Sequence, residues 1–390
     1  MRSEFDVVIV GAGLVGLALA RALADSGLDL AIVEPRLPRS DLPADSAWDS
    51  RVYAVSPGSA AFLERCGAWQ RLAPERVTRV EVMRVFGDAV GARLDFDAYD
   101  AGLRELAFIA EGDRLLQALW AGVREQEIPI FCPSTWSALE FAADRAVLRL
   151  DDGTEISARL VVGADGAESR VRKDAGIAMT PGDYGQLGVV ANFSCEKPHR
   201  GVAFQWFMRE GVLALLPLPG NHVSMVWSIA RERGQELLAL AARELAAEVE
   251  LASRGVLGAL RLVTPPAAFP LKLQRVTQFV KPRLALVGDA AHNVHPLAGQ
   301  GMNLGFRDAR VLADTLIERG AWRDCGDYAL LRRYERARKE DVLALQLTTD
   351  GLQKLFSNDA VLVSGARNFG LNLVDRLPFI KSSLVHHAVA

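Results

Sequence analysis

The chain has 390 residues, of which 50% are hydrophobic and 24% are charged, a composition typical of a globular protein with a large core. Its 45 basic and 48 acidic residues leave a formal charge of -3, which excludes the basic field that attracts nucleic acid. The four cysteines, Cys66, Cys132, Cys195 and Cys325, form no Cys-x-x-Cys pair, so we expect unpaired thiols in a reducing cytoplasm.

The first elements predict a βαβ unit of a parallel sheet. Two apolar, β-branched runs are typical of buried strands, and the segment between them has helix-forming composition. The strand, helix and strand are predicted at Asp6–Val10, Leu14–Ser26 and Leu28–Glu34. Two acids precede the apolar run Val7–Ala20, which is too short to span a bilayer, so we expect neither a signal peptide nor a membrane helix but a soluble protein.

A glycine-rich turn, Gly11-Ala12-Gly13-Leu14-Val15-Gly16, lies between the first strand and the helix. In this context Gly11 makes the tight turn, Gly13 lets a pyrophosphate approach the backbone, and Gly16 lets helix and strand pack closely. The helix N-terminus adds free N–H groups for the phosphates. Glu34 closes the second strand, where its carboxylate can accept ribose hydroxyls and would repel a 2′-phosphate. The pattern predicts FAD or NAD rather than NADP.

A second loop follows a predicted hairpin. Its strands, Ala146–Leu150 and Glu155–Val162, flank an Asp-Gly turn signal at Asp152-Gly153. The second strand runs into a segment from Gly163 through Asp165-Gly166 to Arg172. Taken alone, this segment fits either a nucleotide-contacting loop or a β-turn capped by Asp165.

The character of the chain then changes to short strands separated by Gly, Pro and Asn turns. These strands are predicted at Gly188–Phe193, Val202–Met208, Val212–Pro217 and His222–Ile229, and a helix is predicted at Gln235–Ser253. The pattern indicates an antiparallel sheet domain inserted into a nucleotide-binding domain.

A third motif runs from Gly288-Asp289 to Asp308, directly after a predicted strand at Arg283–Val287. Its glycine-rich turn opens a helix, Leu304–Glu318, whose N-terminus is a second anion site suited to an electron-rich ring that becomes negative on reduction. His292 and His295 have no Cys or carboxylate partner at a supporting spacing, so no metal site is predicted.

The C-terminal part predicts a long helix at Tyr328–Leu355 and then a tail with an amphipathic pattern. Packing of this tail against the body or a partner subunit and contact with a membrane surface both remain open.

In this order, the three motifs resemble those of the single-component aromatic hydroxylases that use FAD, the para-hydroxybenzoate hydroxylase fold. The stretch from His295 to Gly305, continuing to Asp308, is similar to the signature of one branch, the ubiquinone-biosynthesis hydroxylases. Asp49–Ser56 and Arg367–Gly370 also resemble that branch.

The resemblance implies an α/β fold: a Rossmann-like FAD-binding domain, an inserted, mostly antiparallel β-sheet substrate domain and a helical C-terminus. We assign residues 1–76, 99–178 and 270–350 to the FAD-binding domain, 77–98 and 179–269 to the substrate domain, and 351–390 to a helical tail.

The resemblance also implies where FAD is held. The ADP half would lie on Gly11, Gly13, Gly16 and Glu34, with Arg51 and Arg114 reaching the ribityl and phosphate region. For both arginines a surface salt bridge is the alternative. Asp289 would bind a ribityl hydroxyl, and Asp165 with Gly166 would touch FAD and the incoming nicotinamide.

The residues that would border the isoalloxazine ring are Pro296, Gly299, Gly301, Met302 and Asn303. The flavin carries the chemistry, so no catalytic side chain is assigned, and Pro296 and His295 are the candidates near the ring.

The implied activity is a monooxygenation, in which reduced flavin captures O2 as a hydroperoxide that hydroxylates a prenylated phenol on the way to ubiquinone. NAD(P)H is the default electron donor, although no second Gly-x-Gly-x-x-Gly follows a later strand to bind it. That absence, with the lack of a redox cysteine pair, argues against disulfide reductases.

A set of apolar side chains in the predicted sheet offers a wall for such a substrate: Phe204, Trp206, Phe207, Leu213, Leu215, Leu216 and Trp227. Strand alternation puts Phe204 and Trp206 on one face and Phe207 on the other, so only one set can line a pocket. Ordinary sheet core is the alternative.

Two other functions remain open: a hydroxylase or epoxidase of the same fold acting on another aromatic metabolite, and a flavoprotein scaffold of a biosynthetic complex. The expected partners are a hydrophobic phenol, other quinone-biosynthesis proteins and a second copy of the chain, but not nucleic acid. The expected location is the cytoplasm, with peripheral contact at the inner membrane as an open alternative.

Overall fold

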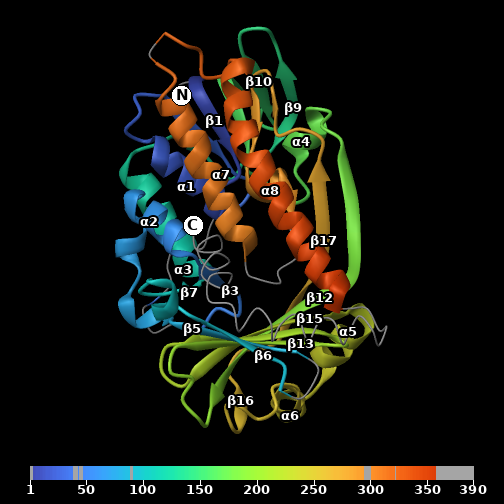
Figure 1. The fold of residues 1–390 in the computed structure, drawn as a ribbon. Coiled ribbons are helices and arrows are strands. Elements are labelled where there is room, and N and C mark those ends of the chain that lie inside the picture. Colours follow the sequence, from blue (N-terminus) through green and yellow to red (C-terminus); the bar gives the residue numbers. More distant parts are fainter. Residues whose placement is uncertain are drawn as a thin grey trace.

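A computed structural model describes residues 3–37, 43, 47–87, 91–293, 300–320 and 322–356. Figure 1 shows an upper part, in which helices cover a sheet, and a lower part formed mainly by a second sheet. The upper part contains the first strand and the long helices α7 (Gln300–Ile317) and α8 (Tyr328–Phe356). The fold class expected from the sequence is therefore confirmed.

The upper sheet has the strand order β18-β19-β11-β1-β2-β8, with β10 and β9 attached to β11. Its strands are β1 (Glu4–Val10), β2 (Leu30–Val33), β8 (Ile130–Phe131), β9 (Trp136–Phe141), β10 (Ala146–Leu150), β11 (Glu155–Gly163), β18 (Val280–Lys281) and β19 (Leu284–Leu286). The central pairs are parallel, and the residues from Val7 to Val10 are fully buried, as an apolar run in a covered sheet requires. The predicted hairpin is confirmed, with Gly153 at φ +86° in its turn.

Helices pack on this sheet through α1 (Leu14–Leu23), which contacts both α3 (Gly112–Glu125) and α7. Two shorter helices are α2 (Pro57–Arg65) and α4 (Arg170–Asp174). A small sheet, β3 (Val52–Val55), β7 (Ala107–Glu111) and β4 (Thr78–Val80), links this part to the rest. Single 3-10 turns lie at Trp69–Arg71, Pro74–Arg76, Tyr99–Ala101 and Gly288–Ala290.

The lower sheet has the order β20-β17-β12-β15-β14-β13-β5-β6, with β16 on β12. Its strands are β5 (Val82–Phe86), β6 (Arg93–Asp97), β12 (Met179–Cys195), β13 (Val202–Met208), β14 (Gly211–Leu218), β15 (His222–Ala230), β16 (Leu260–Leu262), β17 (Ala267–Val276) and β20 (His292–Asn293). Every pair is antiparallel except β13 with β5. Strand β17 carries the ladder on to Val276, beyond the assigned domain boundary at 269, and the domain boundaries themselves stay a prediction.

The helix expected at Gln235–Ser253 is wrong as one element, because the chain forms two helices there, α5 (Arg231–Ala239) and α6 (Ala242–Ala252). Leu240 and Ala241 are extended between them, and the Glu244 carboxylate accepts the N–H of Ala241 (3.0 Å). The break lets both helices place buried leucines on one apolar face of the lower sheet.

That face is the core under α5 and α6, and it contains five members of the expected substrate wall. They are Phe204, Trp206, Leu213, Leu215 and Trp227. In Figure 1, α6 lies on the side of the sheet away from the upper part. These five side chains therefore form ordinary sheet core, while Phe207 and Leu216 belong to smaller clusters elsewhere.

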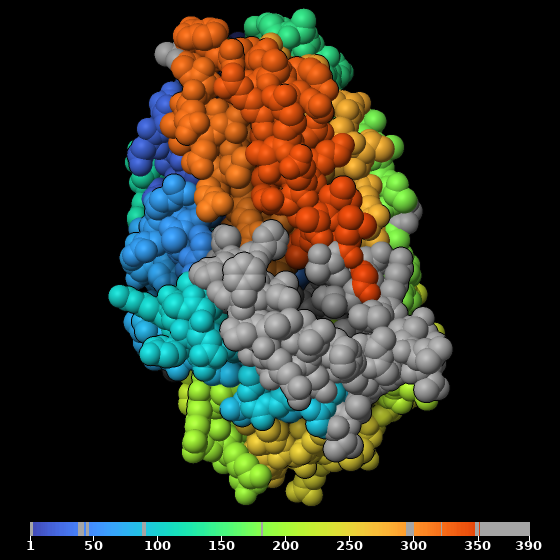
Figure 2. All heavy atoms as spheres, viewed as in Figure 1, coloured from blue at the N-terminus to red at the C-terminus, as the bar shows by residue number. Residues whose placement is uncertain are grey.

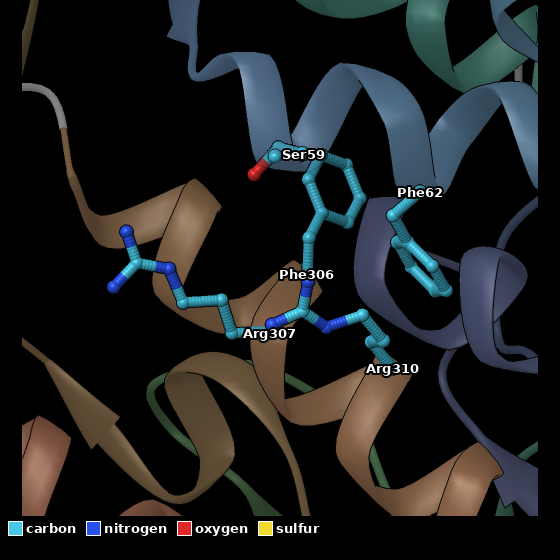
Figure 3. Close-up of a pocket in the computed structure, with 6 residues that line it drawn as sticks. Ser59, Phe62, Phe306, Arg307 and Arg310 are labelled. Atoms are coloured by element: carbon cyan, nitrogen blue, oxygen red, sulfur yellow. The ribbon is translucent and has the colours of Figure 1, made fainter. Parts of the chain in front are cut away.

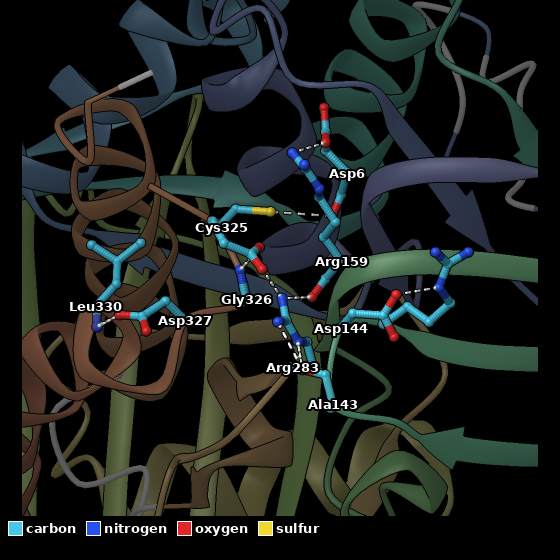
Figure 4. Close-up of polar contacts among 11 residues, drawn as sticks. Asp6, Ala143, Asp144, Arg159, Arg283, Cys325, Gly326, Asp327 and Leu330 are labelled. Atoms are coloured by element: carbon cyan, nitrogen blue, oxygen red, sulfur yellow. Dashed lines mark hydrogen bonds and ion pairs between the residues drawn. The ribbon is translucent and has the colours of Figure 1, made fainter. Parts of the chain in front are cut away.

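The loop before α8 is fixed to the starts of the upper strands (Figure 4). The Arg283 guanidinium donates to the carbonyl of Ala143 (2.9 Å) and pairs with Asp324, and the Cys325 thiol donates to the carbonyl of Asp6 (3.4 Å). All four cysteines are free, and burial raises the pKa of Cys66 and of Cys325 to about 12, so these two thiols stay protonated at neutral pH.

Helix α8 runs without interruption through position 351, where a separate tail was expected, and the rest of that tail lies outside the described residues. Among the helices in the described ranges, none is long and apolar enough to cross a membrane.

The crossing of α1 and α7 makes one prediction about stability. A Cβ on Gly305 would lie 2.6 Å from Cγ2 of Val15, whereas a Cβ on the exposed Gly351 of α8 would meet nothing within 4 Å. We expect Gly351→Ala to stabilise the protein by up to about 1 kcal/mol through helix propensity. Gly305→Ala should instead destabilise it by about 1–3 kcal/mol, because the crossing is already closely packed.

Urea unfolding followed by circular dichroism measures both variants. Equal unfolding midpoints for the two would show that the crossing tolerates a methyl group.

Candidate cofactor and active site

Three predicted motifs meet at one edge of the upper sheet. Strand β11 lies between β1 and β19, and all three run parallel, with Val10 beside Gly163 and Gly163 beside Leu286. The carboxyl ends of parallel neighbours lie at the same edge, which is where ligands bind in open α/β sheets. The loops after Val10, Gly163 and Val287 are therefore neighbours, although they are far apart in the sequence.

The glycine turn lies directly against the second motif. Gly11 has φ +111°, and a Cβ there would lie 2.4 Å from the carbonyl oxygen of Ala164. A Cβ on Gly16 would lie 2.0 Å from the carbonyl oxygen of Gly11. No side chain can be accommodated at either position, so these two glycines fix the approach of loop, helix and strand.

Gly13 is the opposite case, because a Cβ there would meet nothing within 4 Å. The first backbone bond of α1 runs from the N–H of Leu17 to the carbonyl of Gly13 (3.0 Å), so the N–H groups before Leu17 have no acceptor in the helix. No side chain caps this end, and its first turn holds no acid. Open space beside uncapped N–H groups fits a pyrophosphate.

Glu34 lies directly after β2 and holds the glycine turn. Its carboxylate accepts the N–H of Ala12 (2.6 Å) and that of Arg36 (3.0 Å), one on each oxygen. A carboxylate has about four acceptor positions, so lone pairs remain for the hydroxyls of a ribose. The predicted contact of Glu34 with the ribose stays a prediction, and its bond to Ala12 places the carboxylate beside the glycine turn.

Asp289 and Arg51 are the open polar groups at the same edge. The Asp289 side chain is accessible to solvent, although protein atoms surround much of it. This enclosure raises the pKa of Asp289, while His292 and Arg51 lower it by smaller amounts. The Arg51 guanidinium lies 5.6 Å from the ring centre of Tyr53 and 5.9 Å from that of Phe269. Neither charged side chain forms an ion pair in the described part of the chain, so both can bind a ligand.

Asp165 caps a helix. Its carboxylate accepts the Ser169 hydroxyl (2.5 Å) and the N–H groups of Arg170 (2.7 Å) and Val171 (3.0 Å) at the start of α4. The capped turn that the sequence left open is thus present, with Gly166 at φ +80°. The loop that contains Asp165 lies against Gly11 through the backbone of Ala164 and Asp165. Because the Asp165 carboxylate is engaged in the cap, the backbone near Gly166 is the part of this loop that can reach a cofactor.

In the third motif, Gly301 and Asn303 lie within a helix, whereas they were expected in a turn before that helix. Helix α7 begins at Gln300, four residues earlier than expected, so Gly301, Met302 and Asn303 form its first turn. The Asn303 amide accepts the N–H of Ser56 (3.0 Å) and donates to the carbonyl of Ala54 (2.8 Å). It therefore ties α7 to the β3–α2 junction. His295, Pro296 and Gly299 lie outside the described residues.

Two buried carboxylates organise this region, and no role was predicted for either from the sequence. Asp308 accepts the N–H of Gly288 (2.9 Å), His292 Nε2 (2.5 Å) and Arg338 Nε (2.8 Å). The charges of His292 and Arg338 hold the pKa of Asp308 below its usual range, against the burial that raises it. Asp308 thus joins the loop that carries Asp289 to both α7 and α8.

Glu111 is the second buried carboxylate. It accepts two bonds from Arg76 (2.7 and 2.8 Å), one from Arg114 Nε (3.2 Å) and the N–H of Asp49 (2.8 Å). Arg114 also donates to the carbonyl of Pro43 (3.0 Å). Arg114 therefore forms a salt bridge, but a largely buried one and not the surface pair given as the alternative, and Glu111 positions the segment that leads to Arg51.

The lower sheet turns its second face toward the upper part of the molecule. Strand register places Val190, Val226, Ala214 and Gln205 in one row on this face. Asn192 lies one row away and donates from its amide to the carbonyl of Asp49 (2.8 Å), which joins the two parts. Apart from Gln205, the row is apolar and free of charge.

The described residues contain no group of three His, Cys, Asp or Glu side chains that could hold a metal. At the sheet edge, the open space beside Gly13, the remaining lone pairs of Glu34 and the Asp289 carboxylate fit a dinucleotide with a pyrophosphate, a ribose and a polyol chain.

Comparison with known proteins identifies a family whose model covers all three motif loops. The family model of the FAD binding domain matches residues 4–346. The chain is 38% identical to a protein named ubiquinone hydroxylase UbiL from Rhodospirillum rubrum, over 98% of this chain and 89% of that one. It is 35% identical to the 3-demethoxyubiquinol 3-hydroxylase of Escherichia coli, over 98% of both chains.

A solved structure gives the same fold at lower identity. A probable FAD-dependent monooxygenase from Pseudomonas aeruginosa, PqsL, superimposes with a TM-score of 0.78 at 22% identity, over 94% of this chain and all of that one.

Gly13→Val tests the nucleotide turn. Gly13 has φ -75° and ψ 179°, which valine tolerates, so we expect the fold to be kept. The isopropyl group would fill the space beside the α1 N-terminus and weaken FAD binding by roughly 100-fold or more, because the phosphates could no longer reach the helix N–H groups. Flavin absorbance of purified protein, with circular dichroism as the control for folding, measures this. Full flavin content in a folded variant would contradict the placement.

Asp289→Asn tests the enclosed carboxylate. Its pKa is higher in the folded protein than in the unfolded chain, so ionisation near neutral pH favours the unfolded chain. We therefore expect the flavin-free variant to be more stable than flavin-free wild type above the folded pKa. The difference should disappear below the unfolded value of about 3.9.

The same variant should bind FAD about tenfold more weakly, because a charged hydrogen-bond acceptor becomes neutral. Thermal unfolding of flavin-free protein from pH 3 to pH 8, together with FAD titration, measures both effects. A variant less stable than wild type at pH 7 would contradict this assignment.

Proposed function

The chain belongs to the FAD-dependent monooxygenases of the ubiquinone-biosynthesis hydroxylase family, and on this premise we propose that it hydroxylates the ring of a prenylated phenol on the route to ubiquinone. The observation that carries this proposal is the meeting of the three motif loops at one sheet edge, above an uncharged face of the second sheet. The substrate class comes from the names of the two relatives.

FAD, when bound, supplies electron transfer to O2 and delivery of one oxygen atom to the ring, with NAD(P)H as the proposed electron donor. The chain supplies binding and orientation. Gly13 and the α1 N-terminus would hold the pyrophosphate, and Glu34 would hold the adenosine ribose. Asp289 would accept from a ribityl hydroxyl, with Arg51 beside it.

The first turn of α7 has a further part in this proposal. Its N–H groups carry a partial positive charge at the helix N-terminus, which stabilises negative charge on a nearby ring. Because Asn303 ties this turn to the β3–α2 junction, the turn is fixed before any ligand arrives. A fixed dipole costs no reorganisation during the reaction.

The substrate would lie between this edge and the row Val190, Val226, Ala214 and Gln205. The row offers no cation for a carboxylate, so it suits a neutral phenol. Apolar side chains there also exclude water, which protects a reactive oxygen donor.

For the location we propose peripheral contact with the membrane that holds a prenylated substrate, together with contact with other quinone-biosynthesis proteins. The support is the chemistry of the substrate, because a polyprenyl tail partitions into lipid.

The test is mass spectrometry of quinone intermediates in cells that lack this protein. We expect an unhydroxylated prenylated phenol to accumulate and the wild-type gene to restore the pool. A normal quinone pool would reject the proposal in favour of another aromatic metabolite. Restoration by a folded, FAD-loaded variant without turnover would favour a scaffold.

Ala214→Phe tests the uncharged row. A benzyl group there would project from the sheet face on which we place the substrate, so we expect turnover to fall at least about tenfold with flavin content unchanged. Ala239→Phe, on the exposed side of α5, is the matched control and should keep turnover. Equal activity of both variants would place the substrate elsewhere.

A further inference from the structure

A shallow hollow lies between the first turn of α2 and the middle of α7. Figure 2 shows these two helices side by side at the surface, α2 in blue and α7 in orange. The residues that line the hollow are Gly58, Ser59, Phe62, Phe306, Arg307 and Arg310. In Figure 3 the hydroxyl of Ser59 and the guanidinium groups of Arg307 and Arg310 surround an open area. The side chains leave almost no enclosed room, so a ligand would lie at the open mouth.

The described residues that line the hollow include two arginines and no acid. Neither Arg307 nor Arg310 forms a hydrogen bond or ion pair in the described part of the chain, and Nε of Arg307 is buried without an acceptor. A buried donor that lacks an acceptor destabilises the protein, and more so when it is charged. Surface arginines normally point into water or toward a carboxylate, so two arginines converging on an acid-free hollow call for a ligand.

The two acids whose charges act on Arg307 are already engaged by another arginine. Asp308 and Asp341 both bond to Arg338, at 2.8 and 2.7 Å. Burial and the charges of Arg338 and Arg310 together lower the pKa of Arg307, and those acids offset only part of this effect. Among the described residues, positive charge therefore outweighs negative charge around Arg307.

The α2 side adds neutral donors. The Ser56 hydroxyl caps the helix by accepting the N–H of Ser59 (3.2 Å), while the N–H of Gly58 lies too early in the helix to find an acceptor within it. The N-terminus of this nine-residue helix thus faces the hollow with a partial positive charge.

We propose that this hollow binds a phosphate group, held by Arg307, Arg310 and the first turn of α2. A tetrahedral oxyanion matches two guanidinium groups and helix N–H donors, because each guanidinium can give two parallel bonds. This proposal does not rest on the proposed function. Since Ser56 also bonds to Asn303, an occupied site would act on the first turn of α7 beside the cofactor.

Arg307→Gln and Arg310→Gln, each purified with bound FAD, test the site with inorganic phosphate as the probe. Calorimetry at constant ionic strength should give saturable binding to wild type, weakened at least about tenfold in each variant. Arg333→Gln, on the exposed face of α8, is the matched control and should bind as wild type does. No saturable binding to wild type, or equal binding by all four proteins, would overturn the proposal.

Folding does not confound this test, because Arg310 makes no hydrogen bond or ion pair with the described residues that its loss would break. Flavin content and circular dichroism of Arg310→Gln establish that the protein is intact. If Arg307→Gln fails to fold, Arg310→Gln alone decides the outcome.

A second experiment distinguishes a soluble phosphate from a lipid headgroup. Flotation with phosphatidylglycerol vesicles, against phosphatidylcholine vesicles, compares wild type with Arg310→Gln. Binding to the anionic vesicles that Arg310→Gln loses and that free phosphate competes away supports the site with a lipid as its source. Phosphate binding without flotation supports the site with a soluble ligand. Flotation that is unchanged in Arg310→Gln, with phosphate binding unchanged as well, contradicts it.

Discussion

The contact on which this structure depends is the approach of backbone to backbone at the end of β1. Gly11 meets the carbonyl of Ala164, Gly16 meets Gly11, and Val15 fills the space against Gly288 and Gly305. Segments from the whole length of the chain come together there at distances that side chains would forbid. The result is an edge where helix N-termini, a free carboxylate and a free guanidinium all face one space.

Two buried acids keep that edge in place. Asp308 binds a backbone N–H, a histidine and an arginine, while Glu111 binds two arginines and a backbone N–H. A buried carboxylate is stable only when its oxygens are satisfied, so each acid fixes every group that it touches. The loops that carry Asp289 and Arg51 are thus held by charge as well as by packing. Their rigidity suits a site in which the protein contributes orientation more than chemistry.

The sequence was informative wherever the decisive signal is local. Buried strands, the Asp-Gly hairpin and the glycine turn depend on neighbouring residues, and the structure has them within a few positions of the expected bounds. Asp308 and Glu111 gave no signal, because Arg338 and Arg76 lie 30 and 35 residues from them and the adjacent Arg114 looks like an ordinary surface charge. Strand alternation predicts that Phe204 and Trp206 share one face of the sheet. It does not predict whether that face lines a pocket or packs in the core, because this depends on where α6 lies. The break at Leu240 likewise depends on the sheet beneath it.

The strand order has a consequence for synthesis of the protein on the ribosome. Strand β11 is made early, but its parallel neighbour β19 is not made until nearly the whole second sheet has emerged. During that interval the end of β11 that β19 will cover is an open, apolar strand edge, the kind of surface that pairs with other chains. Contacts between residues so far apart also form slowly. A nascent chain of this protein therefore exposes this strand edge until β19 has emerged, and the flavin edge is complete only after that.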